Sequence, residues 1–261
     1  MTENTTTLAA RLRADEVIVT AWSGLAPAIL CELLGRAGYP AITLDMQHGQ
    51  HDIASVREGL ASTALGGAHR VARIPVGENA TASRLLDLGA EAVIAPMINS
   101  ADDARAFVDA IKYPPVGARS WGPHRGAMLM GRPPMDYLRC ANDETLGFAM
   151  IETPEAFEVL DEILQVPGLD AVFVGPADLS LTLSNGAELD PENDATRKAA
   201  AEIATRTRAA GKIAGKFCTS VEDVAWATEA GFRFLAYGVD MLLFTEAASD
   251  LLTSIGTHTK A

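Results

Sequence analysis

The chain has 261 residues, of which 48% are hydrophobic, and a formal net charge of -13 from 21 basic and 34 acidic residues. This length can bury a substantial core, and the negative charge argues against nucleic acid or an anionic membrane as the main partner. No apolar run is long enough to span a bilayer, and the N-terminus lacks the pattern of a signal peptide. The three cysteines (Cys31, Cys140 and Cys218) show no CxxC spacing, so we expect reduced thiols in a cytoplasmic protein.

Short β-branched runs alternate with longer helix-like stretches along the whole chain. Most of the short runs are almost wholly apolar, which is typical of parallel strands that are covered on both faces. Proline at first-turn positions, such as Pro27, and glycine after a last turn, such as Gly38, mark helices between them. The predicted strands are residues 17–22, 41–45, 69–74, 92–96, 147–152, 171–174, 213–217 and 232–237.

Eight β-then-α units without a linker predict one (β/α)₈ barrel, a TIM barrel, that spans residues 1–261 as a single domain. An open doubly wound sheet is the alternative. Two connections are long, residues 99–146 after the fourth strand and residues 175–212 after the sixth. Loops that leave the C-terminal ends of barrel strands build the active site, so both segments are candidates to cover a substrate.

Two acidic residues follow neighbouring strands at this end of the predicted barrel. Glu152 ends the fifth run in FAMIET, and Asp178 follows the sixth in FVGPADLS, 26 residues later. Their carboxylates would therefore come from adjacent strands and could share a cation. Two oxygen ligands that leave room for water and substrate suit Mg²⁺ or Mn²⁺. The alternative is that Glu152 is a carboxylate at a helix N-terminus and that Asp178 caps a turn.

A histidine lies three residues after an aspartate where the second strand ends, in LDMQHG. Asp45 could orient the ring of His48 and raise its basicity, as a general base requires, although a lone histidine is more often structural. His51 follows in HGQH. We expect it to open a helix beyond the rim of the barrel and to be solvated.

Three further strand ends carry side chains that would face the barrel mouth. Arg73 ends the third strand, and because an unpaired buried guanidinium is costly, it must meet a substrate oxygen or an internal carboxylate of Asp45 or Glu152. Trp22 ends the first strand and either packs in the barrel or forms a wall of the substrate pocket. Phe217 ends the seventh strand and is expected to shape the same pocket.

A Gly-Pro turn after the sixth strand is a candidate site for a carboxylate. The turn of Gly175, Pro176, Ala177 and Asp178 could present backbone N–H groups to it, all but that of Pro176, which has none, since glycine permits close approach. A second loop, GARSWGP, contains Arg119. We expect Arg119 to anchor this loop rather than to contact a substrate or a neighbouring subunit.

Taken together, seven motifs in fixed order resemble the HpcH/HpaI family of class II pyruvate aldolases. They are LDMQHG, ARIP, VIAPMINSADDA, PPVGARSWG, FAMIETPEA, GLDAVFVGPADLS and GVD. The resemblance extends from Trp22 to the last helix, and the wider family includes citrate-lyase-like and malyl-coenzyme-A-type lyases. It implies a (β/α)₈ barrel whose eighth helix is exchanged between subunits in a homohexamer, a trimer of dimers.

The resemblance also implies roles for individual residues. The departures from the usual family pattern are Met150, where a glutamine is common, and RSWGP, where R-G-x-G is frequent. The metal ligands of the family fall on Glu152 and Asp178, its histidine–aspartate pair on His48 and Asp45, its enolate-contacting arginine on Arg73, and its carboxylate-holding backbone amides on Ala177 and Asp178.

The implied reaction is an aldol cleavage or addition. A divalent cation (Mg²⁺ or Mn²⁺, with Co²⁺, Ni²⁺ or Zn²⁺ as further options) would bind a keto acid and lower the energy of its enolate. The enolate of pyruvate or hydroxypyruvate then adds to an aldehyde, or is released when a 4-hydroxy-2-keto acid splits. In this account His48 moves the proton and Arg73 stabilises the oxyanion.

Three other functions compete with this one. A Schiff-base aldolase would use Lys216 or Lys212 of KIAGKF as its nucleophile. A coenzyme-A thioester lyase would share the same core, but the sequence shows no basic patch for the phosphates of that cofactor. A non-enzymatic barrel that binds a carboxylate would leave the Asp45–His48 pair idle.

Overall fold

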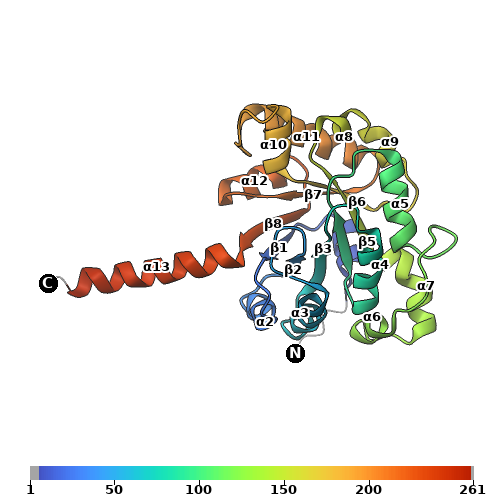
Figure 1. The fold of residues 1–261 in the computed structure, drawn as a ribbon, viewed down its shortest axis with the longest axis horizontal. Helices are drawn as coiled ribbons and strands as arrows, with labels where there is room; N and C mark the ends of the chain where they lie inside the picture. The colour runs from blue at the N-terminus through green and yellow to red at the C-terminus, as the bar shows by residue number, and fades with distance from the viewer. Residues whose placement is uncertain (1–5, 260–261) are drawn as a thin grey trace.

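The structure, a computed structural model, describes residues 6–259, and their strands close into one barrel (Figure 1). All eight strands are parallel and lie side by side in chain order, and β8 pairs back onto β1. The predicted (β/α)₈ barrel is therefore confirmed, and the open sheet is excluded. The strands are β1 (Ile18–Ser23), β2 (Ala41–Asp45), β3 (His69–Arg73), β4 (Ala92–Ala95), β5 (Leu146–Ile151), β6 (Ala171–Val174), β7 (Ile213–Phe217) and β8 (Phe234–Val239).

Five strands, β1, β3, β4, β5 and β8, differ from the prediction by one or two residues at one or both ends. Strand β8 begins at Phe234 and not at residue 232, because the N–H of Phe232 bonds the carbonyl of Ala227 and closes the preceding helix. Strand β5 ends at Ile151, so Glu152 lies just beyond the sheet. A side chain at that position stands at the rim of the barrel, where active sites of this fold lie.

The interior of the barrel is packed at one end and open at the other. Apolar side chains from every strand fill it, and helix α1 (Leu8–Arg13) closes the N-terminal end with buried Leu8, Ala9 and Leu12. The space at the C-terminal ends of the strands is left for the site.

A ring of helices covers the outside of the barrel over a second apolar cluster. The ring consists of α2 (Ile29–Arg36), α3 (Ile53–Leu65), α4 (Asn79–Leu88), α5 (Ala101–Ile111), α6 (His124–Leu129), α7 (Pro134–Glu144), α8 (Pro154–Glu158), α9 (Leu160–Leu164), α10 (Pro176–Leu183), α11 (Asp194–Ala209) and α12 (Val221–Glu229). No helix among residues 6–259 is both long and apolar enough to cross a membrane.

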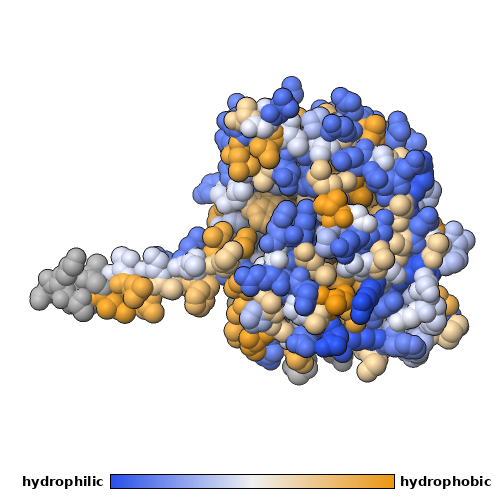
Figure 2. Space-filling model, viewed as in Figure 1, coloured by the Kyte–Doolittle hydropathy of each residue, from blue (hydrophilic) through white to orange (hydrophobic). Residues whose placement is uncertain are grey.

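The last helix, α13 (Asp240–Thr259), departs from this ring. It projects away from the barrel as an isolated arm, drawn in red in Figure 1. Apolar side chains line part of its length without cover from the rest of the chain, as Figure 2 shows, and Phe244 is 71% exposed. Such a helix is expected to find its apolar partner on another molecule.

Candidate active site

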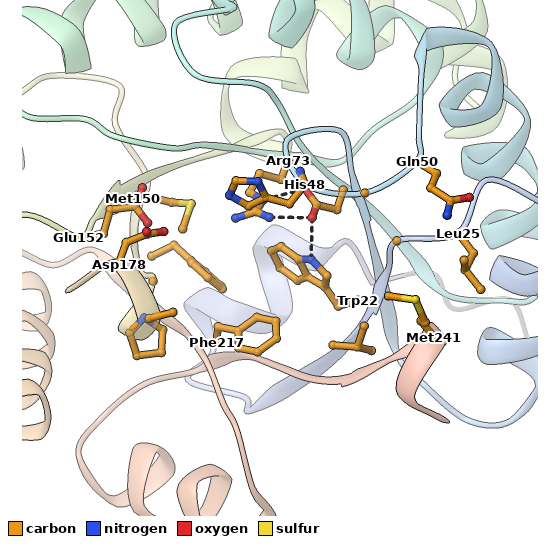
Figure 3. Close-up of a pocket in the computed structure, with 18 residues that line it drawn as sticks. Trp22, Leu25, His48, Gln50, Arg73, Met150, Glu152, Asp178, Phe217 and Met241 are labelled. Atoms are coloured by element: carbon orange, nitrogen blue, oxygen red, sulfur yellow. Dashed lines mark hydrogen bonds and ion pairs between the residues drawn. The ribbon is translucent and has the colours of Figure 1, made fainter. Parts of the chain in front are cut away.

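A cavity of about 370 Å³ opens at the C-terminal ends of the strands. It contains every residue that the sequence analysis assigned to catalysis, substrate or metal (Figure 3). Its lining is Trp22, Gly24, Leu25, Asp45, His48, Gly49, Gln50, Arg73, Met150, Glu152, Phe173, Gly175, Pro176, Ala177, Asp178, Phe217, Val239 and Met241.

Arg73 and Asp45 form a buried ion pair at the centre of this cavity. They are paired residues on neighbouring strands, and the guanidinium donates from Nε to Oδ1 (2.8 Å) and from Nη2 to Oδ2 (2.6 Å). Trp22 donates from Nε1 to Oδ2 at 3.2 Å, and its ring lies 4.9 Å from the guanidinium carbon. Burial acts to raise the pKa of Asp45, but Arg73 and Trp22 outweigh it and hold the pKa below its usual range. The ion pair uses Nε and Nη2, so a fixed, planar guanidinium has Nη1 left to meet a substrate oxygen.

We had expected Asp45 to hold the ring of His48, but it does not. Its Oδ1 instead accepts from the backbone N–H groups of Gln47 (3.0 Å) and His48 (3.4 Å). The carboxylate thus fixes the backbone of the loop after β2, an arrangement that short aspartate side chains favour next to a turn. The side chain of His48 is exposed and lines the cavity between its two ends (Figure 3).

Glu152 is buried at one end of the cavity, with only 1% of the residue exposed. Its Oε1 accepts the N–H of Met97 at 2.8 Å, and Met97 has the left-handed φ of 55°. A Cβ at Gly175 would lie 2.3 Å from Oε2, so only glycine leaves this carboxylate its space. Burial raises the pKa of Glu152 to about 7; the Met97 N–H opposes this shift, and the charge of Asp178 adds to it.

Asp178 reaches the same end of the cavity from the first turn of α10. The helix begins at Pro176, directly after Gly175, and the first N–H to bond back within it is that of Leu179, to the carbonyl of Gly175. The N–H groups of Ala177 and Asp178 therefore have no helical acceptor. Such groups at a helix N-terminus favour an anion, and Ala177 is exposed at the cavity.

These two carboxylates fit a divalent cation. The negative charge of Asp178 disfavours ionisation of Glu152, so a cation beside both would relieve the repulsion. Within residues 6–259, no cluster of three or more histidine, cysteine, aspartate or glutamate side chains could hold a metal. A cation held here would have two carboxylate ligands, with the remaining positions left for water and substrate oxygens, as Mg²⁺ accepts.

Aromatic and apolar side chains form the walls of the cavity. The ring of Trp22 lies edge-on to Phe217, with 5.3 Å between centroids, and stacks on Phe173 at 6.0 Å. Leu25 and Met241 lie at the far end from the acidic pair (Figure 3). The sequence analysis missed this far end. The only signal for it was that loops after β1 and β8 must meet where a barrel closes.

The long connections contribute unequally to the site. Residues 175–212 supply the first turn of α10, but no residue of 99–146 lines the cavity, so our expectation for that segment is wrong for this chain. Arg119 is buried and anchors its loop as predicted, because its Nη2 pairs with Asp87 at 2.6 Å and its guanidinium lies on the ring of Tyr113.

The lysines of the Schiff-base alternative lie outside the cavity. Lys216 points from β7 toward α12, where its Nζ lies 2.5 Å from a carboxylate oxygen of Asp223, and it is 1% exposed. Lys212 donates to the carbonyl of Leu169, before β6 begins and thus at the opposite end of the barrel. Neither amine lines the cavity, and this geometry contradicts a Schiff-base mechanism.

His51 is buried, which corrects the expectation that it is solvated. It is 6% exposed, and its Nε2 lies 3.1 Å from Oγ of Ser23, while its Nδ1 lies 3.2 Å from Oγ of Ser55. Burial lowers the pKa of His51, against the opposing charges of Asp240 and Asp45. The ring is therefore part of the packed structure beneath the His48 loop.

Comparison with known proteins places the chain among aldolases and lyases. A family model described as HpcH/HpaI aldolase/citrate lyase matches residues 19–247. A hydroxypyruvate/pyruvate aldolase of Rhizorhabdus wittichii is 37% identical over 88% of this chain and 91% of its own length. A 4-hydroxy-2-oxo-heptane-1,7-dioate aldolase of Shigella sonnei is 32% identical over 97% and 95%. The crystal structure of an HpcH/HpaI aldolase/citrate lyase family protein from Burkholderia cenocepacia superimposes with a TM-score of 0.85 and 29% identity, covering 95% of this chain and 98% of that one.

Proposed function

The chain belongs to the HpcH/HpaI aldolase/citrate lyase family, and from this we propose that it is a metal-dependent aldolase. Its substrates would be 4-hydroxy-2-keto acids, made or split through the enolate of pyruvate or hydroxypyruvate. One observation carries the proposal: a buried acidic pair, free helix N–H groups, a fixed guanidinium and an exposed histidine line a single cavity.

Glu152 and Asp178 would hold the cation, with Mg²⁺ or Mn²⁺ as the first choice and Co²⁺, Ni²⁺ or Zn²⁺ as further options. When bound, the cation supplies Lewis acidity that lowers the energy of an enolate. The support for this site is the donor set itself, since Oε2 of Glu152 is given space by Gly175 and faces the same end of the cavity as Asp178.

The chain's own residues bind and orient the keto acid. The N–H groups of Ala177 and Asp178 would receive its carboxylate. The guanidinium of Arg73, held flat by Asp45, would stabilise the negative charge that develops on the keto oxygen. His48 would take a proton from the carbon next to the keto group, or return one to it. Trp22, Phe217 and Met150 would wall the pocket and set the preference among aldehydes.

The arm α13 supports an assembly in which this helix packs on a partner subunit. Exposed apolar side chains occur on the arm at Phe244 and Leu251, and on the barrel at Ile29 and Leu33 of α2. Figure 2 shows apolar surface along the arm and on the barrel near its root. Exchange of α13 between two copies would cover both surfaces, and we propose a homohexamer built from three such dimers.

The proposal is tested by turnover in the reconstituted enzyme. The metal-free protein is given each candidate cation and assayed for condensation of pyruvate or hydroxypyruvate with a panel of aldehydes, with the 4-hydroxy-2-keto acid as the measured product. We expect product with at least one cation and none in the presence of excess chelator. Absence of product with every cation and aldehyde would argue against an aldolase, and thioester cleavage would then become the reaction to assay.

A further inference from the structure

A buried polar network lies beside the cavity, at the root of the arm. It consists of Ser23 at the end of β1, His51 after the β2 loop, and Asp240 as the first residue of α13. Oγ of Ser23 lies 3.1 Å from Nε2 of His51 and 3.1 Å from Oδ2 of Asp240. All three are buried, and Ser23 is fully so.

Asp240 joins the arm to the turn that follows β1. Its carboxylate accepts the N–H of Gly24 at 3.0 Å, the N–H of Leu25 at 3.0 Å and the N–H of its own neighbour Met241 at 2.8 Å. With the hydroxyl of Ser23, four donors share two carboxylate oxygens, so each oxygen has two donors. Leu25 and Met241 also line the cavity.

The same turn is held against the loop that carries His48. The N–H of Gln50 donates to the carbonyl of Gly24 at 2.7 Å. A Cβ at Gly49 would lie 3.1 Å from the Cα of Gly24 and 2.3 Å from the carbonyl oxygen of Asp45, so the two backbones touch without room for a side chain. The position of the loop therefore depends on the turn, and the position of the turn depends on Asp240.

The network is not built for nucleophilic chemistry. Asp240 bonds the serine and not the imidazole, and because the serine hydroxyl donates to Asp240, the Nε2 of His51 must donate to the serine. The imidazole thus cannot take the serine proton as a general base would, and the buried hydroxyl has no access to substrate.

We propose that Ser23, His51 and Asp240 are positioning residues, which fix the loop of residues 46–51 against the first turn of α13. The consequence for catalysis rests on the proposed aldolase function: His48 is held in the correct position next to the reacting carbon only while the network is intact. Displacement of a catalytic group by about 1 Å can cost ~10²-fold in rate. A substitution in the network, which does not touch the substrate, is therefore enough to slow the reaction.

The positioning itself is tested without turnover, on the metal-free protein. Hydrogen exchange of backbone amides is followed by mass spectrometry in the natural protein, Ser23→Ala, His51→Leu and His51→Gln. Ser23→Ala and His51→Leu should exchange faster over residues 46–51 while strands β3 to β6 stay protected. His51→Gln, whose amide can still donate to Ser23, should remain close to the natural protein. Unchanged protection of the loop in both disrupting variants would overturn the proposal.

The kinetic consequence is measured as exchange of the methyl protons of pyruvate in the Mn²⁺-loaded enzyme. Ser23→Ala and His51→Leu should lower kcat by ~10–10²-fold and leave KM for pyruvate nearly unchanged, because the keto acid is held at the other end of the cavity. His51→Gln should recover most of kcat. The matched control is His69→Gln, a buried histidine paired with Glu91 at the opposite end of the barrel, which should keep its kcat.

The two measurements separate this proposal from the proposed function. If the loop exchanges faster in Ser23→Ala and His51→Leu but the natural protein never exchanges pyruvate protons, the positioning network stands and the aldolase function is rejected. Equal losses in kcat for His51→Leu, His51→Gln and His69→Gln would mean general destabilisation and would overturn the positioning role.

Discussion

Asp45 links the two charged features at the centre of the cavity, the guanidinium of Arg73 and the loop that carries His48. The sequence places it at the strand end beside His48, and the cavity contains both. Its oxygens, however, are occupied by Arg73, Trp22 and two backbone N–H groups. The ion pair with Arg73 was one of the alternatives left open by the sequence. The choice between them depended on strand register, which sets Asp45 opposite Arg73 and is not visible in spacing along the chain.

Substitutions of His48 and Arg73 should separate proton transfer from charge stabilisation. His48→Ala should slow exchange of the pyruvate methyl protons by ~10²–10⁴-fold, the usual cost of losing a general base. Arg73→Lys keeps the charge but loses the planar fork that Asp45 holds, so it should also be impaired. The measurement is the pH dependence of exchange: the limb that reports the base should vanish in His48→Ala and persist, at reduced height, in Arg73→Lys. An unaltered limb in His48→Ala would assign the base to another group.

The second prediction concerns the affinity for the cation. Glu152→Gln and Asp178→Asn each remove one of two charged ligands, so each should weaken Mn²⁺ binding by more than the ~10–10²-fold that loss of a supporting contact costs. Calorimetric titration of the metal-free proteins measures this directly. Glu155→Gln, an exposed glutamate in the next helix, is the matched control and should bind as the natural protein does. If both ligand variants bound Mn²⁺ as tightly as the natural protein does, Glu152 and Asp178 would not be the metal ligands.

The third prediction follows from the raised pKa of Glu152, about 7 in the folded metal-free protein. In the unfolded chain a glutamate titrates near pH ~4.3, so the folded state binds the extra proton between these values. This stability is fully present below pH ~4.3 and is lost as the pH rises through about 7, by roughly 4 kcal/mol in all. Urea unfolding of metal-free protein across this range should show the decline for the natural chain, and a flatter profile for Glu152→Gln. Identical slopes in the two proteins would contradict it.

At the scale of elements, the strands were predictable because each is a short apolar run between helix signals. All eight occur where predicted, and the errors in the bounds of β1, β3, β4, β5 and β8 are of one or two residues. The sequence did not show which groups of the loops would shape the site. Met97 shapes the site around Glu152 through a backbone N–H, which leaves no chemical signature in the sequence. Gly175 was predicted to belong to the site, but its role in leaving space for Glu152 was not. His51 was misjudged for a similar reason, since its partner Ser23 comes from β1 and is itself held by Asp240 of the last helix.

Charge placed on the arm α13 should disrupt the proposed assembly. Replacing Leu251 and Leu252 of α13 with glutamate places charge on side chains that are 64% and 69% exposed in the single chain. If the arm packs on a partner, these changes should reduce the mass measured by analytical ultracentrifugation, since each buried leucine stabilises the contact by ~1.5–3 kcal/mol. Glu246→Gln, on the same helix, should leave the assembly intact. An unchanged mass in the double variant would show that the arm is free in solution.

For the whole molecule, the architecture divides stability from chemistry. Helix α1 and the packed interior close one end of the barrel, and the residues of the cavity gather at the other, on the ends of seven of the eight strands and the loops that follow them. The closed sheet makes neighbours of β1 and β8, and so brings Leu25 and Met241 into one wall. Closure is a property of the complete fold, which explains why this wall could not be predicted from local patterns.

We propose that the cavity lowers the energy of a keto-acid enolate with a cation held by Glu152 and Asp178. The most direct test is proton NMR of pyruvate in D₂O with the natural protein, first free of metal and then with Mg²⁺ or Mn²⁺ added. We predict loss of the methyl signal only after the cation is added, at a rate at least ~10²-fold above the metal-free protein, without any aldehyde present. An equally fast loss in the metal-free, chelated protein would contradict the account.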